Sequence, residues 1–392
     1  MFRGERQIER PFRWGIVGGG RTSGVGYKHR MGAMRDNISF LLKAAAFDVD
    51  FARCVDFGVS LGMDPERLYP DYKTMFEREA ALEDGIEAVD IATPNFQHYE
   101  ACKAALEAGL HVICEKPLFF SVEQGLEIKK LADEKNRVFC VNYGYSGFDL
   151  IMQMRHMVKS GAIGDVTMVD LRYAHGFGCD PAGDLKAEGQ IWRVDPARVG
   201  PSFVLGDLST HTFYISQVIC PELKLSQLLC DRQSFIKSRR PLEDNAYVLM
   251  RYEGGAVGRM WASAVNAGDM RSQIIRIVGT KASLEWNDMH PDELVYAVQG
   301  EPARTLVRGM DYLCDEALEY ERLGALHYTG LMDSWANLYN RFAVAMDAMN
   351  RGDRETLEKL VYPDLDHGID GVRWVCKCVE SADKGGVWVD FE

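Results

Sequence analysis

The chain has 392 residues, of which 47% are hydrophobic and 26% are charged, and its formal net charge is −13. This length exceeds what one small core needs and predicts two domains. The acidic balance argues against a nucleic-acid partner, because the phosphate backbone requires clustered lysine and arginine, and no apolar run approaches the roughly 20 residues of a membrane span.

Ten cysteines are scattered along the chain without a Cys-x-x-Cys pair. This pattern is typical of reduced cysteines in a cytosolic protein and does not suggest a metal site. The first 14 residues, MFRGERQIERPFRW, lack the apolar centre of a signal peptide. We therefore expect a cytoplasmic protein that holds no metal.

The first predicted strand, RWGIVGGG, runs directly into glycines. Gly18 would permit a tight turn, and Gly20 would let a pyrophosphate approach the backbone, as in a dinucleotide-binding loop. Ser23 stands where the third glycine of that fingerprint belongs, with Gly24 beside it, so the motif is imperfect. A glycine-rich turn without a ligand is the alternative interpretation.

The second apolar run, at 41–48, ends in Asp48, where a carboxylate could bind the ribose hydroxyls of a dinucleotide. Such a carboxylate would repel a 2′-phosphate, so NAD is favoured over NADP. Asp48 follows Gly20 by 28 residues, which is longer than the usual spacing of about 20. Asp50 is a rival for the same role, a solvated surface acid is the alternative, and Arg53 could accept a phosphate.

Three further apolar runs, at 85–94, 109–117 and 137–145, alternate with helical patterns, which predicts βαβ units and a parallel sheet. Ligands bind beyond the carboxyl ends of such strands. Polar residues stand at or just after the end of the apolar part of each run and are expected at this sheet edge. They are Thr93, Asn95, His98, Glu115, Lys116, Asn142 and Tyr143.

Cofactor contacts are predicted from Thr93, Asn95, His98 and Glu115. Lys116 is expected at the floor of the crevice, facing the nicotinamide end of the cofactor, because the following proline restricts it to extended geometry. A solvated loop lysine is the alternative.

From about residue 145 the pattern changes to longer β-rich runs joined by glycine-containing turns, followed by two amphipathic helices. We predict an α/β cofactor-binding domain over residues 1–145. A substrate-binding and oligomerisation domain over 146–392 is predicted to be α+β, with a large open, mostly antiparallel sheet whose one face is covered by helices. The stretch 178–190 is the best candidate for a mobile loop.

The segment GDLSTHTFY places Asp207 and His211 four residues apart, hence on one face of a predicted helix. An apolar stripe lies beside the pair and would face the core. It consists of Val204, Leu208, Ile215 and Ile219. The pair is therefore expected at the edge of a pocket, with a helix-surface pair as the alternative.

Taken together, these motifs resemble the Gfo/Idh/MocA oxidoreductases over nearly the whole chain. The matching motifs are GIVGGG, TPN-x-x-H at 93–98, E-K-P at 115–117, SGAIGDV at 160–166, W-R at 192–193 and D-x-x-x-H at 207–211. The resemblance implies a doubly wound Rossmann domain that binds a nicotinamide cofactor and a C-terminal domain with a large open sheet. It also implies oxidation of a secondary hydroxyl of a sugar, glycoside or cyclitol, and a homodimer or homotetramer built through that sheet.

The resemblance further implies that Lys116, Asp207 and His211 are the catalytic set. His211 would be the general base. Lys116 would stabilise the developing alkoxide, and Asp207 would orient these two groups and bind a substrate hydroxyl. Further candidates for substrate contacts are Tyr145, His175, Trp192 and Arg193.

Two other functions would use the same residues. Some members of this family cleave glycosides by transient oxidation with tightly held NAD and no net redox change, and a non-catalytic nucleotide-binding regulator is the third possibility. Ser146-Gly147-Phe148 stands where many relatives carry an Arg-Phe step, which argues against an acidic substrate.

Overall fold

The computed structural model describes residues 8–35, 38–181, 191–269 and 271–392, so most of the predicted mobile loop lies outside the described residues. The described chain divides into two compact units. The parallel-sheet unit consists of the described part of Gly4–Gly144 together with Leu331–Asp370. The antiparallel-sheet unit consists of the described part of Tyr145–Gly330 together with Gly371–Glu392. The functional division at residue 145 stays a prediction.

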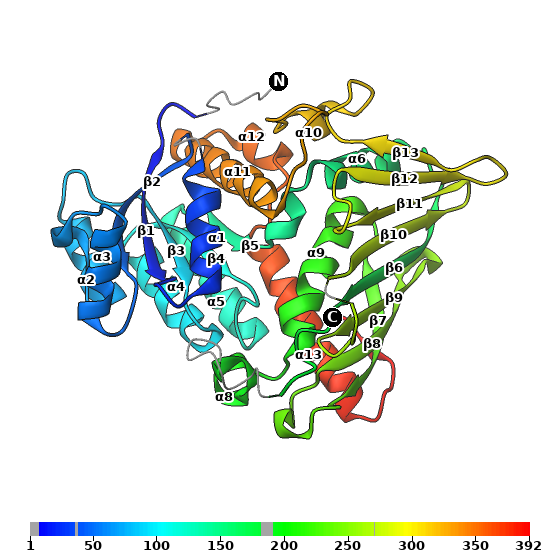
Figure 1. Cartoon of the computed structure of the whole chain (residues 1–392), viewed down its shortest axis with the longest axis horizontal. Coiled ribbons are helices and arrows are strands. Elements are labelled where there is room, and N and C mark those ends of the chain that lie inside the picture. The colour runs from blue at the N-terminus through cyan, green and yellow to red at the C-terminus, as the bar shows by residue number, and fades with distance from the viewer. Residues whose placement is uncertain (1–7, 36–37, 182–190, 270) are drawn as a thin grey trace. The chain divides into compact units, whose positions relative to one another are not determined.

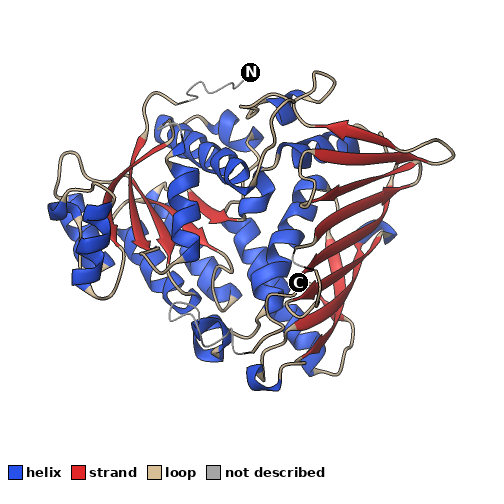
Figure 2. Ribbon diagram, viewed as in Figure 1, coloured by secondary structure: helices blue, strands red, loops and turns tan. Residues whose placement is uncertain are grey.

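The first unit is built on a five-stranded, wholly parallel sheet of order β2-β1-β3-β4-β5 (Figures 1 and 2). Its strands are β1 (Phe12–Gly18), β2 (Phe40–Ala46), β3 (Ala88–Ala92), β4 (His111–Glu115) and β5 (Phe139–Asn142). Every residue of β3, β4 and β5 is buried. Strands covered on both faces read as continuous apolar runs, which is why the sequence pattern predicts this sheet correctly.

Helices connect the strands of this sheet and cover it. They are α1 (Gly24–Ala33), α2 (Phe51–Ser60), α3 (Tyr72–Ala80), α4 (His98–Glu107), α5 (Val122–Lys135), α11 (Leu331–Arg351), α12 (Arg354–Lys359) and the first part of α13 (Leu365–Asp383).

Local sequence decides where these helices begin and end. The Ser121 hydroxyl accepts a hydrogen bond from the Gln124 backbone N–H, and the Gln124 side chain accepts one from the Phe120 N–H, which closes the start of α5. Asn136, in the left-handed region at φ 50°, ends the same helix.

A late helix completes the core of the parallel-sheet unit. On α11, Trp335 packs so closely on α1 that a Cβ added at Gly32 would lie 2.9 Å from the Trp335 Cβ. Tyr339 of the same helix meets the buried Trp14 of β1 edge to face, with ring centroids 6.2 Å apart. A segment that follows strands β6 to β13 of the antiparallel sheet in sequence therefore belongs to the core of the first unit.

The second unit is built on a nine-stranded sheet of order β13-β12-β11-β10-β6-β9-β8-β7-β14. Only the β6–β9 pair is parallel among its described strands, which confirms the prediction of a mostly antiparallel sheet. The strands are β6 (Val166–Ala174), β7 (Leu225–Gln233), β8 (Asn245–Tyr252), β9 (Val257–Ser263), β10 (Gln273–Gly279), β11 (Ala282–Asn287), β12 (Glu293–Val298), β13 (Arg304–Val307) and β14 (Val389–Asp390).

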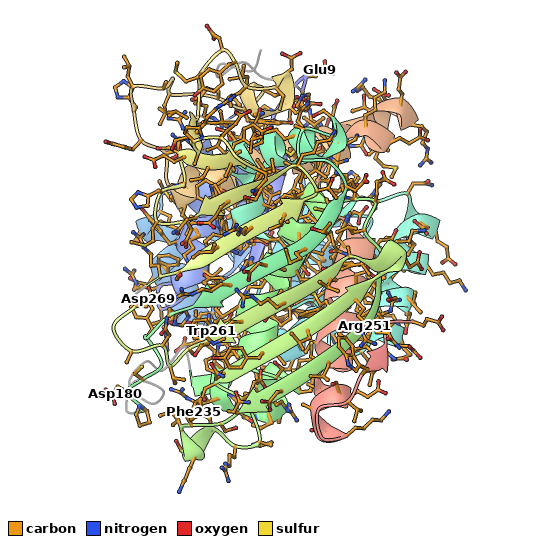
Figure 3. The ribbon with its side chains drawn as sticks, turned by 90° about the vertical axis from the view of Figure 1, so that its right-hand side faces the viewer. Glu9, Asp180, Phe235, Arg251, Trp261 and Asp269 are labelled. Carbon is orange, nitrogen blue, oxygen red and sulfur yellow. The ribbon has the colours of Figure 1, made fainter. Side chains whose placement is uncertain are left out.

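One face of this sheet is covered by helices, and the other is open. The helices of the unit are α6 (Asp149–Lys159), α8 (Pro196–Val199), α9 (Thr210–Ile219), α10 (Asp315–Leu318) and the second part of α13. β8 alternates between buried and exposed residues, which leaves Tyr247 and Leu249 about half exposed, and Figure 3 shows the open face with Trp261 and Arg251 on it. Assembly through this sheet stays a prediction.

Among the described residues, none of the helices combines the length and the apolar composition that crossing a membrane would need.

Candidate active site

The loop after β1 has the shape of an anion-binding turn. Gly18 and Gly19 take positive φ angles of 76° and 69°. Residues other than glycine rarely adopt this backbone conformation. Ser23 caps α1 by accepting a hydrogen bond from the Gly26 N–H at 3.1 Å. The first turn of α1 carries no acidic residue, so its N–H groups and helix dipole suit a pyrophosphate.

Gly26, rather than Ser23 or Gly24, performs the close packing expected of a third fingerprint glycine. A Cβ on Gly26 would lie 2.2 Å from the carbonyl oxygen of Gly19, whereas one on Gly24 would meet nothing within 4 Å. Sequence reasoning missed this residue. It could have been noticed as a glycine inside a predicted helix. Glycine there lowers helix stability by roughly 1 kcal/mol relative to alanine, so its presence suggests a packing reason.

The two rival acids after β2 have different contacts. Asp50 caps α2, because its carboxylate accepts hydrogen bonds from the N–H groups of Ala52 and Arg53. Asp48 lies directly after the strand, accepts a hydrogen bond from the Asp50 N–H at 3.0 Å and lies 3.2 Å from the Arg53 Nε. Asp50 is thus engaged by a helix, and the contact of Asp48 with a ribose stays a prediction.

The turn after β3 offers a shielded hydroxyl and a buried histidine. Within the described part of the chain, the buried Thr93 Oγ1 has no hydrogen-bond partner, which fits a site that a ligand completes. The His98 ring is fully buried, with Nε2 2.9 Å from the Thr93 carbonyl oxygen and Nδ1 3.0 Å from that of Leu118. His98 therefore ties the turns after β3 and β4 together. Its contact with a cofactor, like that of Asn95, stays a prediction.

Glu115 ends β4 as a buried carboxylate with several partners. His29 Nε2 lies 3.0 Å from Oε1, and the Asn142 side-chain amide donates to the same oxygen at 2.5 Å. Burial alone would raise the pKa of Glu115, but the His29 hydrogen bond and the charges of His29 and Lys116 lower it to about 2. A glutamate can therefore end a buried strand here because it stays ionised and paired.

In the antiparallel-sheet unit, Asp207 and His211 lie on a helix that is not regular. Asp207 belongs to a π-helical turn, Leu205–Ser209, that leads into α9, where His211 is the second residue. Such turns often occur at functional sites. The predicted stripe is buried, but nearly all of α9 is buried as well, so the apolar face is not a separate stripe.

Aromatic and polar side chains surround His211 within this unit. The Tyr145 ring meets the His211 ring edge to face at 4.9 Å. The Tyr173 hydroxyl donates to the Tyr145 hydroxyl at 2.7 Å, and the His175 ring lies 6.2 Å from that of Tyr173. Burial raises the pKa of Tyr145 and lowers that of His175, so both groups favour their neutral forms. Tyr173 was not predicted, although strand alternation places it on the face of His175, two residues later.

The predicted Trp-Arg pair meets Asp207. Arg193 Nη1 lies 3.3 Å from a carboxylate oxygen of Asp207, and the Arg193 guanidinium lies 5.1 Å from the centre of the Trp192 ring. This ion pair leaves the local charge balanced, which suits a neutral polyhydroxy ligand better than an acid. The cluster as a whole offers hydroxyl, imidazole, guanidinium and carboxylate groups in one unit.

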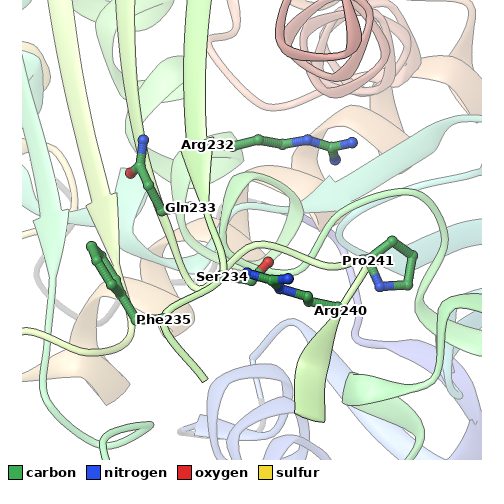
Figure 4. A pocket seen from close by; sticks show the side chains of 6 residues that line it. All are labelled: Arg232, Gln233, Ser234, Phe235, Arg240 and Pro241. Atoms are coloured by element: carbon green, nitrogen blue, oxygen red, sulfur yellow. The ribbon is translucent and has the colours of Figure 1, made fainter. Parts of the chain in front are cut away.

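A surface pocket of about 730 Å³ follows β7 in the same unit (Figure 4). It is lined by Arg232, Gln233, Ser234, Phe235, Arg240 and Pro241. None of the predicted catalytic, cofactor or substrate residues lines it. We assign it no role in the chemistry.

Two family models match this chain. The oxidoreductase family model described as an NAD-binding Rossmann fold matches residues 12–143, and the model for the C-terminal alpha/beta domain of the same family matches residues 155–391. The chain belongs to the Gfo/Idh/MocA oxidoreductase family. The predicted family, fold class and NAD-binding Rossmann domain are thereby confirmed.

Relatives of this family member match over its full length. The chain is 61% identical to the uncharacterized oxidoreductase YfiI of Bacillus subtilis (strain 168), with 100% of both chains covered. The crystal structure of an inositol dehydrogenase homolog from Azotobacter vinelandii complexed with NAD+ is 54% identical, covers 100% of both chains and has a TM-score of 0.97. A second structure of such a homolog, with NADH and myo-inositol, is 54% identical, covers 99% of this chain and 100% of the other, and has a TM-score of 0.94.

Proposed function

We propose that this chain is an NAD-dependent dehydrogenase that oxidises a secondary hydroxyl of a cyclitol, sugar or glycoside. The observation that carries the proposal is the polar cluster of the antiparallel-sheet unit, in which His211 lies among two tyrosine hydroxyls, a second histidine and the Arg193–Asp207 pair. A charge-balanced set of donors and acceptors suits a neutral polyol. The full-length relative crystallised with NADH and myo-inositol supports a cyclitol as the first substrate class to test.

In this proposal His211 is the general base. It takes the proton of the substrate hydroxyl, a role that suits an imidazole near neutral pH. Asp207 orients the imidazole and the substrate, and Arg193 forms an ion pair with Asp207. When bound, the nicotinamide supplies the hydride acceptor.

Lys116 has an electrostatic role in the proposal. The hydroxyl oxygen gains alkoxide character as its proton leaves, and a fixed ammonium group lowers the energy of that charge. The ionised Glu115 beside it in the chain places an opposite charge close to the lysine, and the two charges interact.

Alanine in place of Asp48 is expected to weaken NAD binding by about tenfold or more, the size of one lost charged hydrogen bond, and to weaken NADP binding much less. Titration of the protein with each reduced cofactor, followed by fluorescence, measures both affinities. Asp50→Ala is the matched control, because it removes the cap of α2 and is expected to lower thermal stability without changing the NAD-to-NADP ratio. Equal losses of both cofactors in Asp48→Ala would show that Asp48 does not contact the ribose.

The experiment that tests the proposed function is a screen of inositols, sugars and glycosides with NAD and with NADP, followed by NADH or NADPH absorbance. Steady formation of reduced cofactor with a polyol is the expected result. Cleavage of a glycoside without accumulation of reduced cofactor would replace the proposal with redox-neutral glycoside cleavage. Cofactor binding with no reaction on any compound would favour a regulator.

A further inference from the structure

His29 is a fully buried histidine between two carboxylates of the parallel-sheet unit. It lies on α1, with Nδ1 2.8 Å from Asp90 on β3 and Nε2 3.0 Å from Glu115 at the end of β4. The side chains of His29 and Asp90 have no exposed surface. The Tyr339 hydroxyl on α11 lies 2.5 Å from Nδ1, and the Trp335 ring meets the imidazole edge to face at 4.9 Å.

The two short His29–carboxylate distances indicate which protonation state of the His29 ring this geometry favours. An ionised carboxylate only accepts hydrogen bonds, and a neutral imidazole has a single N–H. His29 faces a carboxylate oxygen with each ring nitrogen, 2.8 Å from Asp90 and 3.0 Å from Glu115, so with both acids ionised only an imidazolium forms an ion pair with each of them. Glu115 is firmly ionised, since its Oε1 also accepts the Asn142 amide hydrogen bond and its charge interacts with that of Lys116.

The charges around His29 support the same assignment. Burial disfavours the imidazolium, but the Asp90 and Glu115 carboxylates outweigh it and raise the pKa of His29 to about 9. The titratable groups that face the ring from packed elements are Asp90, Glu115 and Tyr339. Burial raises the pKa of the Asp90 carboxyl and that of the Tyr339 hydroxyl. The Cys114 and Cys140 thiols and the Lys116 ammonium interact electrostatically with these neighbours.

We propose that His29 is a positioning residue, whose buried imidazolium holds Glu115 ionised and turned into the sheet, and so fixes the backbone from which Lys116 extends. The inference rests on the proposed function for the role of Lys116. A buried ion cluster is a poor way to gain stability, because apolar residues of similar volume often do better. Its place at the carboxyl edge of a parallel sheet, where ligands bind, instead indicates a function.

His111 provides a matched control within the same sheet. It opens β4, is 2% exposed and forms hydrogen bonds with neutral groups, namely the Asn350 side chain through Nε2 and the Val138 N–H through Nδ1. Burial lowers the pKa of His111 to about 4. Two buried histidines of one unit, His29 on α1 and His111 on β4, are therefore expected to differ in charge at neutral pH.

The first test is nitrogen NMR of the full chain labelled at histidine, with His29 and His111 assigned through the variants His29→Gln and His111→Gln. At neutral pH, His29 is expected to give the two similar ring-nitrogen shifts of an imidazolium and to titrate near pH 9, whereas His111 gives those of a neutral ring. A neutral His29, with the proton resident on Asp90, would overturn the proposal. This readout needs neither substrate nor cofactor, so it remains decisive if the proposed function fails.

The second test compares kinetics on a substrate found in the screen above. His29→Gln is expected to lower kcat by about tenfold to a hundredfold, the scale of a small misplacement of a catalytic group, with little change in substrate KM. The wild type is expected to show a change of kcat near pH 9, and this change should be absent in His29→Gln. His111→Gln should lower the melting temperature and leave kcat and its pH profile unchanged. If His29→Gln behaves in the same way, His29 is structural and the proposal is wrong.

Thermal unfolding against pH provides a third readout. Because the pKa of His29 is raised in the folded state, its contribution to stability is complete below its unfolded value of about 6.5 and is lost as pH rises through about 9. The melting temperature of the wild type should therefore fall more steeply between these values than that of His29→Gln. Parallel curves would contradict the imidazolium.

Discussion

Alanine in place of Lys116 or of His211 is expected to lower turnover at least about a hundredfold while leaving NADH affinity unchanged. Loss of the general base removes the acceptor for the hydroxyl proton, a contribution of about a hundredfold to ten-thousandfold in comparable enzymes. Loss of the lysine removes the cation that stabilises the developing alkoxide, an effect of similar size. Both variants are measured by initial rates of NADH formation and by NADH titration followed by fluorescence.

Surface residues of the same types provide controls for these two variants. Lys130→Ala removes a lysine whose side chain is 79% exposed, and His290→Ala removes an exposed histidine. Both are expected to retain the rate of the unmodified protein. A Lys116→Ala or His211→Ala variant that also retained this rate would remove the role assigned to that residue. Loss of NADH binding in either variant would indicate a cofactor contact instead.

Alanine in place of Gly26 is expected to destabilise the parallel-sheet unit by about 1 to 3 kcal/mol, the usual cost of overpacking. The new methyl group would lie 2.2 Å from the Gly19 carbonyl oxygen, so either α1 or the glycine loop must move. NADH binding should weaken by about tenfold or more, because the loop that receives the pyrophosphate is displaced. Thermal unfolding and NADH titration measure the two effects.

Gly24→Ala is the matched control for this substitution. Gly24 lies two residues earlier on the same helix, and a methyl group there would meet nothing within 4 Å. Alanine also restricts the unfolded chain, so the melting temperature should stay the same or rise by the equivalent of about 0.4 to 1 kcal/mol. Equal melting temperatures for Gly24→Ala and Gly26→Ala would show that Gly26 does not pack as described.

Much of the candidate site in the antiparallel-sheet unit could be anticipated from residue types and spacing. The predicted residues Tyr145, His175, Asp207 and Arg193 lie around His211 or contact one another in the structure. Their partner Tyr173 was missed, because a tyrosine at an alternating strand position looks the same whether it faces the core or a site. The π-helical turn was also missed, since a change in helical period leaves no clear trace in one sequence.

Residue patterns alone were enough to predict the parallel sheet, the antiparallel sheet, the glycine loop and the family. Each follows from short-range patterns: continuous apolar runs for strands buried on both faces, longer β-rich runs joined by glycine-containing turns for the antiparallel strands, and motifs of a few adjacent residues. Such patterns can be recognised in the sequence because they depend only on residues that are close together in the chain.

Which distant residues meet could be seen in the folded chain but not in its sequence. It packs α11 against α1, although about 300 residues separate them and the sequence pattern places α11 in the other domain. It also sets His29 between Asp90 and Glu115. A histidine on a helix and two acids on strands carry no mark of their pairing, because the charge of a buried group depends on what surrounds it in space. The folded core, rather than the motif, therefore determines the environment beneath Lys116.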